Sequence, residues 1–346
     1  MTDEPEIGAT GAPTSEPPAP EEPRTPGPAG DAAPALLVAS RARVTIDDVV
    51  ALEAFDLDAR GSRLVLVGDA SPLMALAGAY PLGLAYGAAL AAQGEPSSVA
   101  GRARLASGTM TLLGRDVGAR AHVDLVGAAP FEPPLPADVT LVDWLFDAAR
   151  LALGSMGKTS RAEVRARVSE VVARAQLGGL ARAKLATLPR AARRALILAQ
   201  AALARPAVVV AELPLAGLEA SEAAPVLAAF EALFAETASI VSVGRLDAAG
   251  PEHGFIRRAD HVAAFTRAEL AYFGPPEGLT SRGRLYRVTV VANAAALRDA
   301  LRAEGLVLDG GPERFSLALP EGKGPTDVLV LASQARASVV EIVPVM

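Results

Sequence analysis

The sequence predicts an α/β protein with a mostly parallel sheet, followed by a smaller α+β unit. Two short runs without charge, Val208 to Ala211 and Ser239 to Val243, are rich in β-branched residues, as is typical of strands buried on both faces of a parallel sheet. The amphipathic segment Ala223 to Glu236 separates them, and strands that alternate with helices favour a parallel sheet. From Arg284 onward the predicted order is βαββαβ, which is typical of a split βαβ, ferredoxin-like unit.

The composition narrows the classes of function. Of 346 residues, 51% are hydrophobic, which is enough for a sizeable core. The net charge of −6 and the isoelectric point of about 5.3 argue against a nucleic-acid partner. The chain has no cysteine, which excludes disulfides, thiolate metal sites and a cysteine nucleophile. Because His122, His253 and His261 fall in unrelated segments, we expect no histidine metal site.

The chain divides into three predicted regions. Residues 1–34 are rich in Pro, Glu, Ala and Gly, so we expect a disordered acidic tail and no signal peptide. Residues 35–280 form the main domain, with a helical subdomain at about 133–203, and residues 284–346 form the C-terminal α+β domain. Ser281 to Arg284 is the expected hinge.

The main domain begins with predicted strands and then becomes helical. The strands are Ala35 to Val44, Ala51 to Leu57, Arg63 to Val67, Thr109 to Leu113 and His122 to Val126. The uncharged run Leu73 to Ala92 is long enough to span a bilayer, but Pro81 and many small residues favour a buried helix followed by a loop. Apolar residues spaced near 3.6 predict helices from about Thr140 to Leu203.

The C-terminal unit has six predicted elements. Its strands are Tyr286 to Val291, Leu306 to Leu308, Arg314 to Leu319 and Val339 to Val345, and its helices are Ala294 to Glu304 and Thr326 to Ala337.

The segment VVVAELPLAGLE, Val208 to Glu219, suggests a function. Its strand ends in one carboxylate, Glu212, at the edge where open α/β sheets bind ligands. The segment resembles the Walker B and D-loop region of ABC transporter ATPases, where an apolar strand precedes DEPTSGLD. In this chain Glu212 stands for the Asp and Leu213 for the catalytic Glu.

The resemblance extends over most of residues 36–280. Ser107 to Val117 resembles the hairpin after the phosphate loop, and Ala271 to Leu279 resembles the closing segment of the family. It implies a P-loop NTPase fold, and the C-terminal unit suggests the ATP-binding subunit of an ABC-2 type exporter. Such a subunit is implied to be cytoplasmic, to pair with an ABC permease or a second ATP-binding subunit, and to reach the membrane only through that partner.

The phosphate loop departs from the family's pattern. A working loop, G-x-x-x-x-G-K-[ST], supplies converging N–H groups, a Lys for charge and a hydroxyl for Mg²⁺. Met74 stands in place of the Lys, Ala75 in place of the hydroxyl and Leu73 in place of the second glycine, while Pro72 removes an N–H donor. The loop reads Gly68, Asp69, Ala70, Ser71, Pro72, Leu73, Met74, Ala75, Leu76.

The other motifs depart from the pattern as well. The Q-loop Gln corresponds to Phe131, and the switch His corresponds to Gly244. Leu213 cannot polarise an attacking water, and Glu212 alone is a poor metal site because the loop hydroxyl is missing. The LSGGQ signature corresponds to Leu188, Pro189, Arg190, Ala191 and Ala192.

Two further features have competing interpretations. Ala152 to Thr159, ALGSMGKT, satisfies a relaxed phosphate-loop pattern, but it follows an amphipathic run, and Ser160 with Glu163 predicts a capping box for the next helix. We therefore interpret it as a helix–helix connector. Arg190, Arg193 and Arg194 form either an anion site or a solvated helix face, and the second interpretation is the more common.

The sequence thus leads to a first hypothesis and two alternatives. The first is an ABC-type pseudo-ATPase with a structural or regulatory role beside a membrane exporter, without a cofactor. The second is a divergent but active ATPase that uses ATP and Mg²⁺ to energise export. The third is a regulator whose altered phosphate site, lined by Leu73, Met74, Phe131 and Leu213, binds a neutral ligand.

Overall fold

The computed structural model describes residues 35–46, 48–68, 70–78, 103–117, 125–154, 160–244, 250–266, 268–280, 284–320 and 322–344. The chain divides into two units, Met1–Ala33 and Pro34–Met346, and every described residue belongs to the second. The predicted tail and most of the predicted hinge therefore lie outside the described residues. The three-region division stays a prediction.

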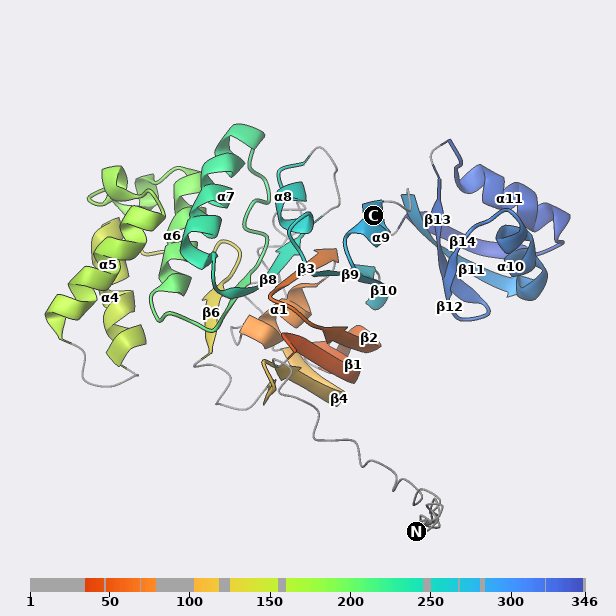
Figure 1. Ribbon diagram of the computed structural model, residues 1–346, viewed down its shortest axis with the longest axis horizontal. Helices are drawn as coiled ribbons and strands as arrows, with labels where there is room; N and C mark the ends of the chain where they lie inside the picture. Colours follow the sequence, from red (N-terminus) through yellow and green to blue (C-terminus); the bar gives the residue numbers. More distant parts are fainter. Residues whose placement is uncertain are drawn as a thin grey trace, which may run out of the picture. The chain divides into compact units, whose positions relative to one another are not determined.

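A six-stranded sheet forms the centre of the main domain, with the order β10-β9-β3-β8-β7-β6 (Figure 1). Strands β9, β3, β8, β7 and β6 are parallel, and β10 pairs antiparallel with β9. The strands are β3 (Arg63–Gly68), β6 (Val126–Ala129), β7 (Val208–Ala211), β8 (Ala238–Val243), β9 (His261–Thr266) and β10 (Glu269–Gly274). The predicted α/β fold with a mostly parallel sheet is confirmed.

A second, antiparallel sheet has the order β2-β1-β4-β5. Its strands are β1 (Leu37–Ile46), β2 (Val49–Ala59), β4 (Ala103–Leu112) and β5 (Arg115–Asp116). Helix α1 (Ser71–Gly78) follows β3 and shares an apolar cluster with these strands. The part of the predicted run Leu73 to Ala92 that follows Gly78 lies outside the described residues.

The central strands lack charge because both of their faces are buried. In β3, Val65 and Val67 join the cluster of the helices, whereas Leu64 and Leu66 join the cluster of the antiparallel sheet. Side chains of a strand point alternately to opposite faces, so apolar layers on both sides leave no position for a solvated residue. The central sheet is therefore the middle of a three-layer core.

The helices of the main domain pack mainly on one face of the central sheet. They are α4 (Leu141–Gly154), α5 (Arg161–Arg174), α6 (Arg190–Ala202), α7 (Ala220–Phe234) and α8 (His253–Ile256), with 3-10 turns at Gly178–Leu180 and Leu185–Thr187. A short helix, α9 (Glu277–Thr280), follows β10. Ser160 caps α5 in a capping box with Glu163, as predicted. The interpretation of the preceding segment as a helix–helix connector agrees with its flanking helices, although residues 155–159 lie outside the described residues.

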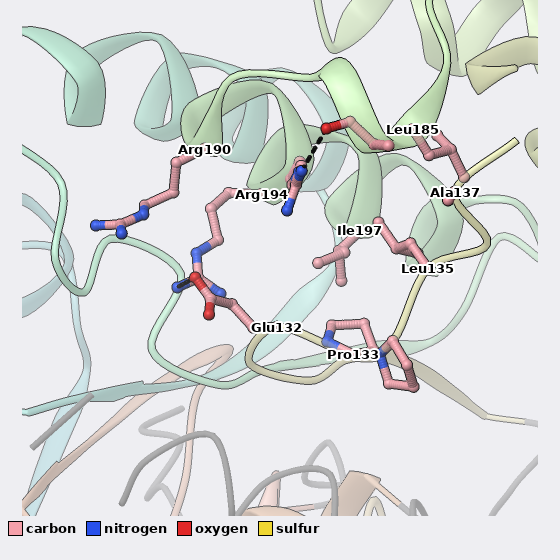
Figure 2. A pocket seen from close by; sticks show the side chains of 11 residues that line it. Glu132, Pro133, Leu135, Ala137, Leu185, Arg190, Arg194 and Ile197 are labelled. Carbon is pink, nitrogen blue, oxygen red and sulfur yellow. Dashed lines mark hydrogen bonds and ion pairs between the residues drawn. The ribbon is translucent and has the colours of Figure 1, made fainter. Parts of the chain in front are cut away.

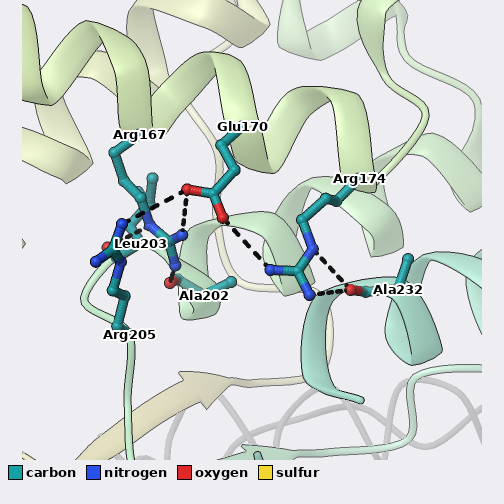
Figure 3. Close-up of polar contacts among 7 residues, drawn as sticks. All are labelled: Arg167, Glu170, Arg174, Ala202, Leu203, Arg205 and Ala232. Carbon is teal, nitrogen blue, oxygen red and sulfur yellow. Dashed lines mark hydrogen bonds and ion pairs between the residues drawn. The ribbon is translucent and has the colours of Figure 1, made fainter. Parts of the chain in front are cut away.

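Two arginines of α5 hold the ends of neighbouring helices (Figure 3). Arg167 donates from Nε to the carbonyl of Leu203 at 3.0 Å and from Nη2 to that of Ala202, at the C-terminus of α6. Arg174 donates to the carbonyl of Ala232 near the end of α7. Because the last carbonyls of a helix lack intrahelical partners and carry partial negative charge, these guanidinium groups complete the two helix ends.

The C-terminal part has the predicted βαββαβ order, and its four strands pair antiparallel in the order β12-β13-β11-β14. Its elements are β11 (Arg284–Ala292), α10 (Ala294–Ala303), β12 (Leu308–Gly310), β13 (Arg314–Leu319), α11 (Pro325–Gln334) and β14 (Ser338–Pro344). Leu297 and Leu301 of α10 and Val328 of α11 pack on the sheet in a separate apolar cluster.

Some elements differ from their predicted positions. The strand expected at His122 to Val126 shares Val126 with β6, Val126–Ala129, whose position is set by its pairing with β7; residues 122–124 of that prediction lie outside the described residues. Strands β9 and β10 were not predicted, since alanines dilute their β-branched pattern and their partner strands supply the pairing. No helix in the described part of the chain is long and apolar enough to cross a membrane.

Candidate functional site

The carboxylate of Glu212 is the centre of the candidate site. Glu212 follows β7, is 1% exposed, and accepts hydrogen bonds from the Ser71 hydroxyl at 2.8 Å and from the Phe131 N–H at 3.2 Å. Ser71 is the first residue of α1, and Phe131 follows β6, so the carboxyl ends of the parallel strands bring the three together. A buried carboxylate with two donors, one at the N-terminus of a helix, is well stabilised.

Two N–H groups of the segment expected to be the phosphate loop donate to carbonyl groups of the same segment. Helix α1 already begins at Ser71, and the N–H of Met74 donates to the carbonyl of Ala70 at 2.9 Å. The N–H of Ala70 donates to the carbonyl of Gly68 at 2.7 Å, and Pro72 has no N–H. These positions cannot offer donors to a phosphate. Asp69 lies outside the described residues.

The retained glycine of the loop has a structural explanation. Gly68 has φ +80°, and a Cβ at this position would lie 2.3 Å from the carbonyl oxygen of Phe265 on the paired strand β9. Only glycine tolerates both the left-handed conformation and this close approach. The one match to the phosphate-loop pattern is thus required by strand packing alone.

The positions of the expected Lys and Mg²⁺ hydroxyl lie in the core. Met74 and Leu73 are 0% exposed, and both belong to the apolar cluster between the two sheets. Ala75 is also buried. The third hypothesis loses three of its four proposed lining residues, because Leu73, Met74 and Phe131 are buried rather than open to a ligand.

Leu213 occupies the end of β7 next to the switch position. Its N–H donates to the Ser242 hydroxyl at 3.0 Å, and its φ of 44° is unusual for a residue with a branched side chain. Its Cδ2 lies 3.8 Å from where a Cβ of Gly244 would be. The structure therefore brings together the two positions where the family places a catalytic carboxylate and a histidine, and both side chains there lack any titratable group.

The segment expected to correspond to the signature contacts the segment expected to correspond to the D-loop. Arg190, the first residue of α6, donates from Nη1 to the carbonyl of Gly217 at 2.8 Å. Leu188 and Ala192 are buried, Ala191 is half-buried and Pro189 is exposed. Leu76 of the phosphate-loop segment is half-buried. Helix α6 begins without a side-chain cap in the described part of the chain.

Arg194 is a feature of the site that sequence reasoning placed wrongly. It was expected on a solvated face, but it is 4% exposed, and its guanidinium carbon lies 3.9 Å from the centroid of the Phe131 ring. Its Nη2 pairs with Glu132 Oε1 at 3.1 Å, as Figure 2 shows. Burial lowers the pKa of Arg194 to about 10, although Glu132 counteracts this effect. The charge run at 190–194 was visible in the sequence, but its burial was not.

The described residues contain no cluster of three or more His, Asp or Glu side chains placed to hold a metal ion. The sequence did not predict the hydrogen bond between the Ser71 hydroxyl and the Glu212 carboxylate. A carboxylate after β7 and a hydroxyl in the loop were both visible, but their contact depends on where α1 starts.

Comparison with known proteins identifies the fold. No protein-family model and no curated protein sequence matches the chain. The structure is similar to CbiO1 of Clostridium perfringens, part of the ABC transporter complex CbiONQ (TM-score 0.52, 12% identity, 78% of this chain and 95% of that chain). It is similar to an ATP-binding subunit of an ABC transporter (0.51, 14%, 86% and 99%) and to MJ1267, an ATP-binding cassette in its ADP conformation (0.52, 13%, 72% and 94%).

The chain has the fold of an ABC transporter ATP-binding subunit. The resemblance of the sequence implies ATP and Mg²⁺ as ligands, but the residues at the expected positions do not fit them. The positions for the phosphate Lys and the Mg²⁺ hydroxyl are the buried Met74 and Ala75, and the Glu212 carboxylate already engages the first residue of α1. The anion-binding end of α1 thus has a negative charge of the chain itself beside it.

Proposed function

We propose that the protein is an ABC-type pseudo-ATPase with a structural or regulatory role beside a membrane exporter. The observation that carries this proposal is the contact of the buried Glu212 carboxylate with Ser71 at the start of α1. A phosphate brought to this helix end would meet a buried carboxylate instead of a lysine. The negative charges of the phosphate and of the Glu212 carboxylate would repel each other strongly, because the site is partly desolvated.

The loss of catalysis is proposed from the same positions. Phosphoryl transfer depends almost wholly on positioning and on stabilising charge. Leu213, Gly244 and Phe131 supply neither a base nor a cation where the fold would use one. The resemblance also implies that each nucleotide of such a dimer lies between one subunit's phosphate loop and the other's signature. Since both segments are altered here, pairing with a competent ATPase would disable both composite sites.

A direct nucleotide titration tests the proposal. Calorimetry with ATP up to millimolar concentrations, with and without Mg²⁺, should show no saturable binding by the wild-type protein. Glu212→Gln keeps the size of the side chain and Glu212→Ala removes it, and neither should create steady-state ATPase activity. Micromolar, Mg²⁺-dependent ATP binding, or ATPase activity that Glu212→Ala abolishes, would establish the active alternative instead.

The partner is proposed from the fold and is tested separately. A permease gene and an intact ATPase gene beside this one would support a role in a transporter. Co-expression with that permease should then bring the chain to the membrane fraction, and purified membranes without the permease should not retain it.

A further inference from the structure

A pocket of about 360 Å³ opens between the segment after β6 and the start of α6 (Figure 2). One part of its lining is apolar and includes Pro134, Leu135 and Ile197. The charged part consists, in the described part of the chain, of Arg190, Arg193 and Arg194 with Glu132 as the counter-charge. Three cationic side chains and one carboxylate thus line the pocket, although the whole chain has a net charge of −6.

The guanidinium group of Arg194 is incompletely paired. Its Nη2 reaches Glu132, but Nε and Nη1 are buried without a hydrogen-bond partner among the described residues. A buried donor without an acceptor costs about 1–3 kcal/mol, and more when it is charged. Buried polar groups are rarely left in this condition unless water, an ion or a ligand completes them.

The same end of α6 has a second electrostatic conflict. The helix begins at Arg190 after Pro189, and it has neither a side-chain cap nor an acidic residue in its first turn. Helix N-termini carry partial positive charge and favour anions, so arginines at this end oppose the dipole. The first five residues of the helix therefore combine three guanidinium groups with uncapped N–H groups.

Two of the arginines have partners that leave donors free for a ligand. Arg193 is exposed and uses Nη2 for the carbonyl of Ala186 at 2.8 Å, and Arg190 uses Nη1 for Gly217. Figure 2 shows Arg190 extending away from the pocket's centre, whereas Arg194 turns toward Glu132. We therefore expect the side chains of Arg193 and Arg194 to bind an anion. Leu135 and Ile197 would contact an apolar group of the same ligand.

We propose that this pocket binds a small oxyanion that carries an apolar group, such as an amphipathic carboxylate or a phosphate monoester. The oxyanion would accept from Arg194 and Arg193 and compensate the start of α6, and its apolar group would lie against the proline and aliphatic side chains. Planar guanidinium groups suit carboxylate and phosphate equally well, so the pocket sets the ligand's charge and shape rather than its exact oxyanion.

The experiment measures thermal unfolding of the full chain with sodium hexanoate and with hexyl phosphate, against sodium acetate and sodium chloride at equal ionic strength. Both hexyl ligands should raise Tm in a saturable way, and acetate should need at least about tenfold more for the same shift, since each buried methylene adds binding energy. If hexyl phosphate alone is saturable, the natural ligand is a phosphate; if hexanoate alone is saturable, it is a carboxylate.

The variants locate the binding. Arg194→Met and Arg193→Gln should each raise the half-saturating concentration by about tenfold or more, as expected for the loss of a charge-assisted hydrogen bond. The matched control is Arg182→Gln, which removes an exposed arginine in the turn before α6 and should leave the half-saturating concentration unchanged. Arg193→Gln alters an exposed side chain and keeps the test decisive if Arg194→Met does not fold.

Two results would overturn the proposal. One is a Tm response to hexanoate and hexyl phosphate no larger than that to chloride; the other is half-saturation unchanged in Arg193→Gln and in any folded Arg194 variant. Because the probes contain no nucleotide, neither result bears on whether Glu212 closes the nucleotide site.

Discussion

Arg167 and Arg194 are buried arginines on two helices of the same domain, and their surroundings differ in nearly every respect. Arg167 uses Nε and Nη2 for two helix-terminal carbonyls and pairs Nη1 with Glu170 at 2.7 Å (Figure 3). Arg194 has one paired nitrogen and lies at the beginning of its helix (Figure 2). Burial alone therefore does not give an arginine a structural role, because the pairing of its donors and its place at the start or end of a helix decide that role.

The largest expected effect is that of Arg167→Met. This change leaves the Leu203 carbonyl without its side-chain donor and the Ala202 carbonyl with only the backbone N–H of Arg205, so we expect the free energy of unfolding to fall by about 3 kcal/mol. Urea titration at pH 7 measures it. An exposed change, Arg182→Met, should stay within about 0.5 kcal/mol. A loss as small as the control's would mean that Arg167 does not hold the end of α6.

Arg194→Met should act in the opposite direction when no anion is present. The change removes a buried charge with two unpaired nitrogens and leaves Glu132 half exposed, so its carboxylate is solvated. We expect the free energy of unfolding to be unchanged or higher by about 1–3 kcal/mol. The same urea titration decides it, and a loss comparable to that of Arg167→Met would show that the two arginines have equivalent structural roles.

Alkaline pH should reduce the difference in the free energy of unfolding between wild type and Arg194→Met. Burial lowers the pKa of Arg194 in the folded protein to about 10, so above this pH the unfolded chain binds more protons at this residue than the folded one. The destabilisation caused by burying the charged form of Arg194 therefore decreases, and the free energy of unfolding of the wild type increases, as pH rises through 10. Paired urea titrations at pH 7, 9 and 10.5 should show a shrinking gap, and a constant gap would contradict the proposed cost of burying the charge.

Arg174→Gln should have the smallest effect. Arg174 completes the end of α7 as Arg167 completes that of α6, but its side chain is 40% exposed. Water can replace the lost donor, so we expect a loss of at most about 1 kcal/mol. Thermal unfolding at low and high salt measures this loss of stability. A loss equal to that of Arg167→Met would show that the exposure of Arg174 does not weaken its contribution at the helix end.

Much of the fold could be predicted from the sequence because local pattern and final burial agree. The uncharged run Val208 to Ala211 became β7 with the predicted bounds, and Ser160 with Glu163 formed the predicted cap. Strands β9 and β10 could not be predicted in this way, since their pattern is weak and their partners lie far away in the sequence. The altered motif residues were visible, but the Ser71–Glu212 contact joins positions 141 residues apart.

The α/β class follows from the local pattern of the sequence, and residue identity alone puts Met74, Leu213 and Gly244 where the resemblance implies charged or basic side chains. The positions of the remaining charges, in contrast, depend on tertiary contacts. These contacts placed the Glu212 carboxylate against the start of α1 and buried Arg194 beside Phe131. Pairing and desolvation depend on neighbours brought from distant segments of the chain, and no local sequence pattern specifies these neighbours.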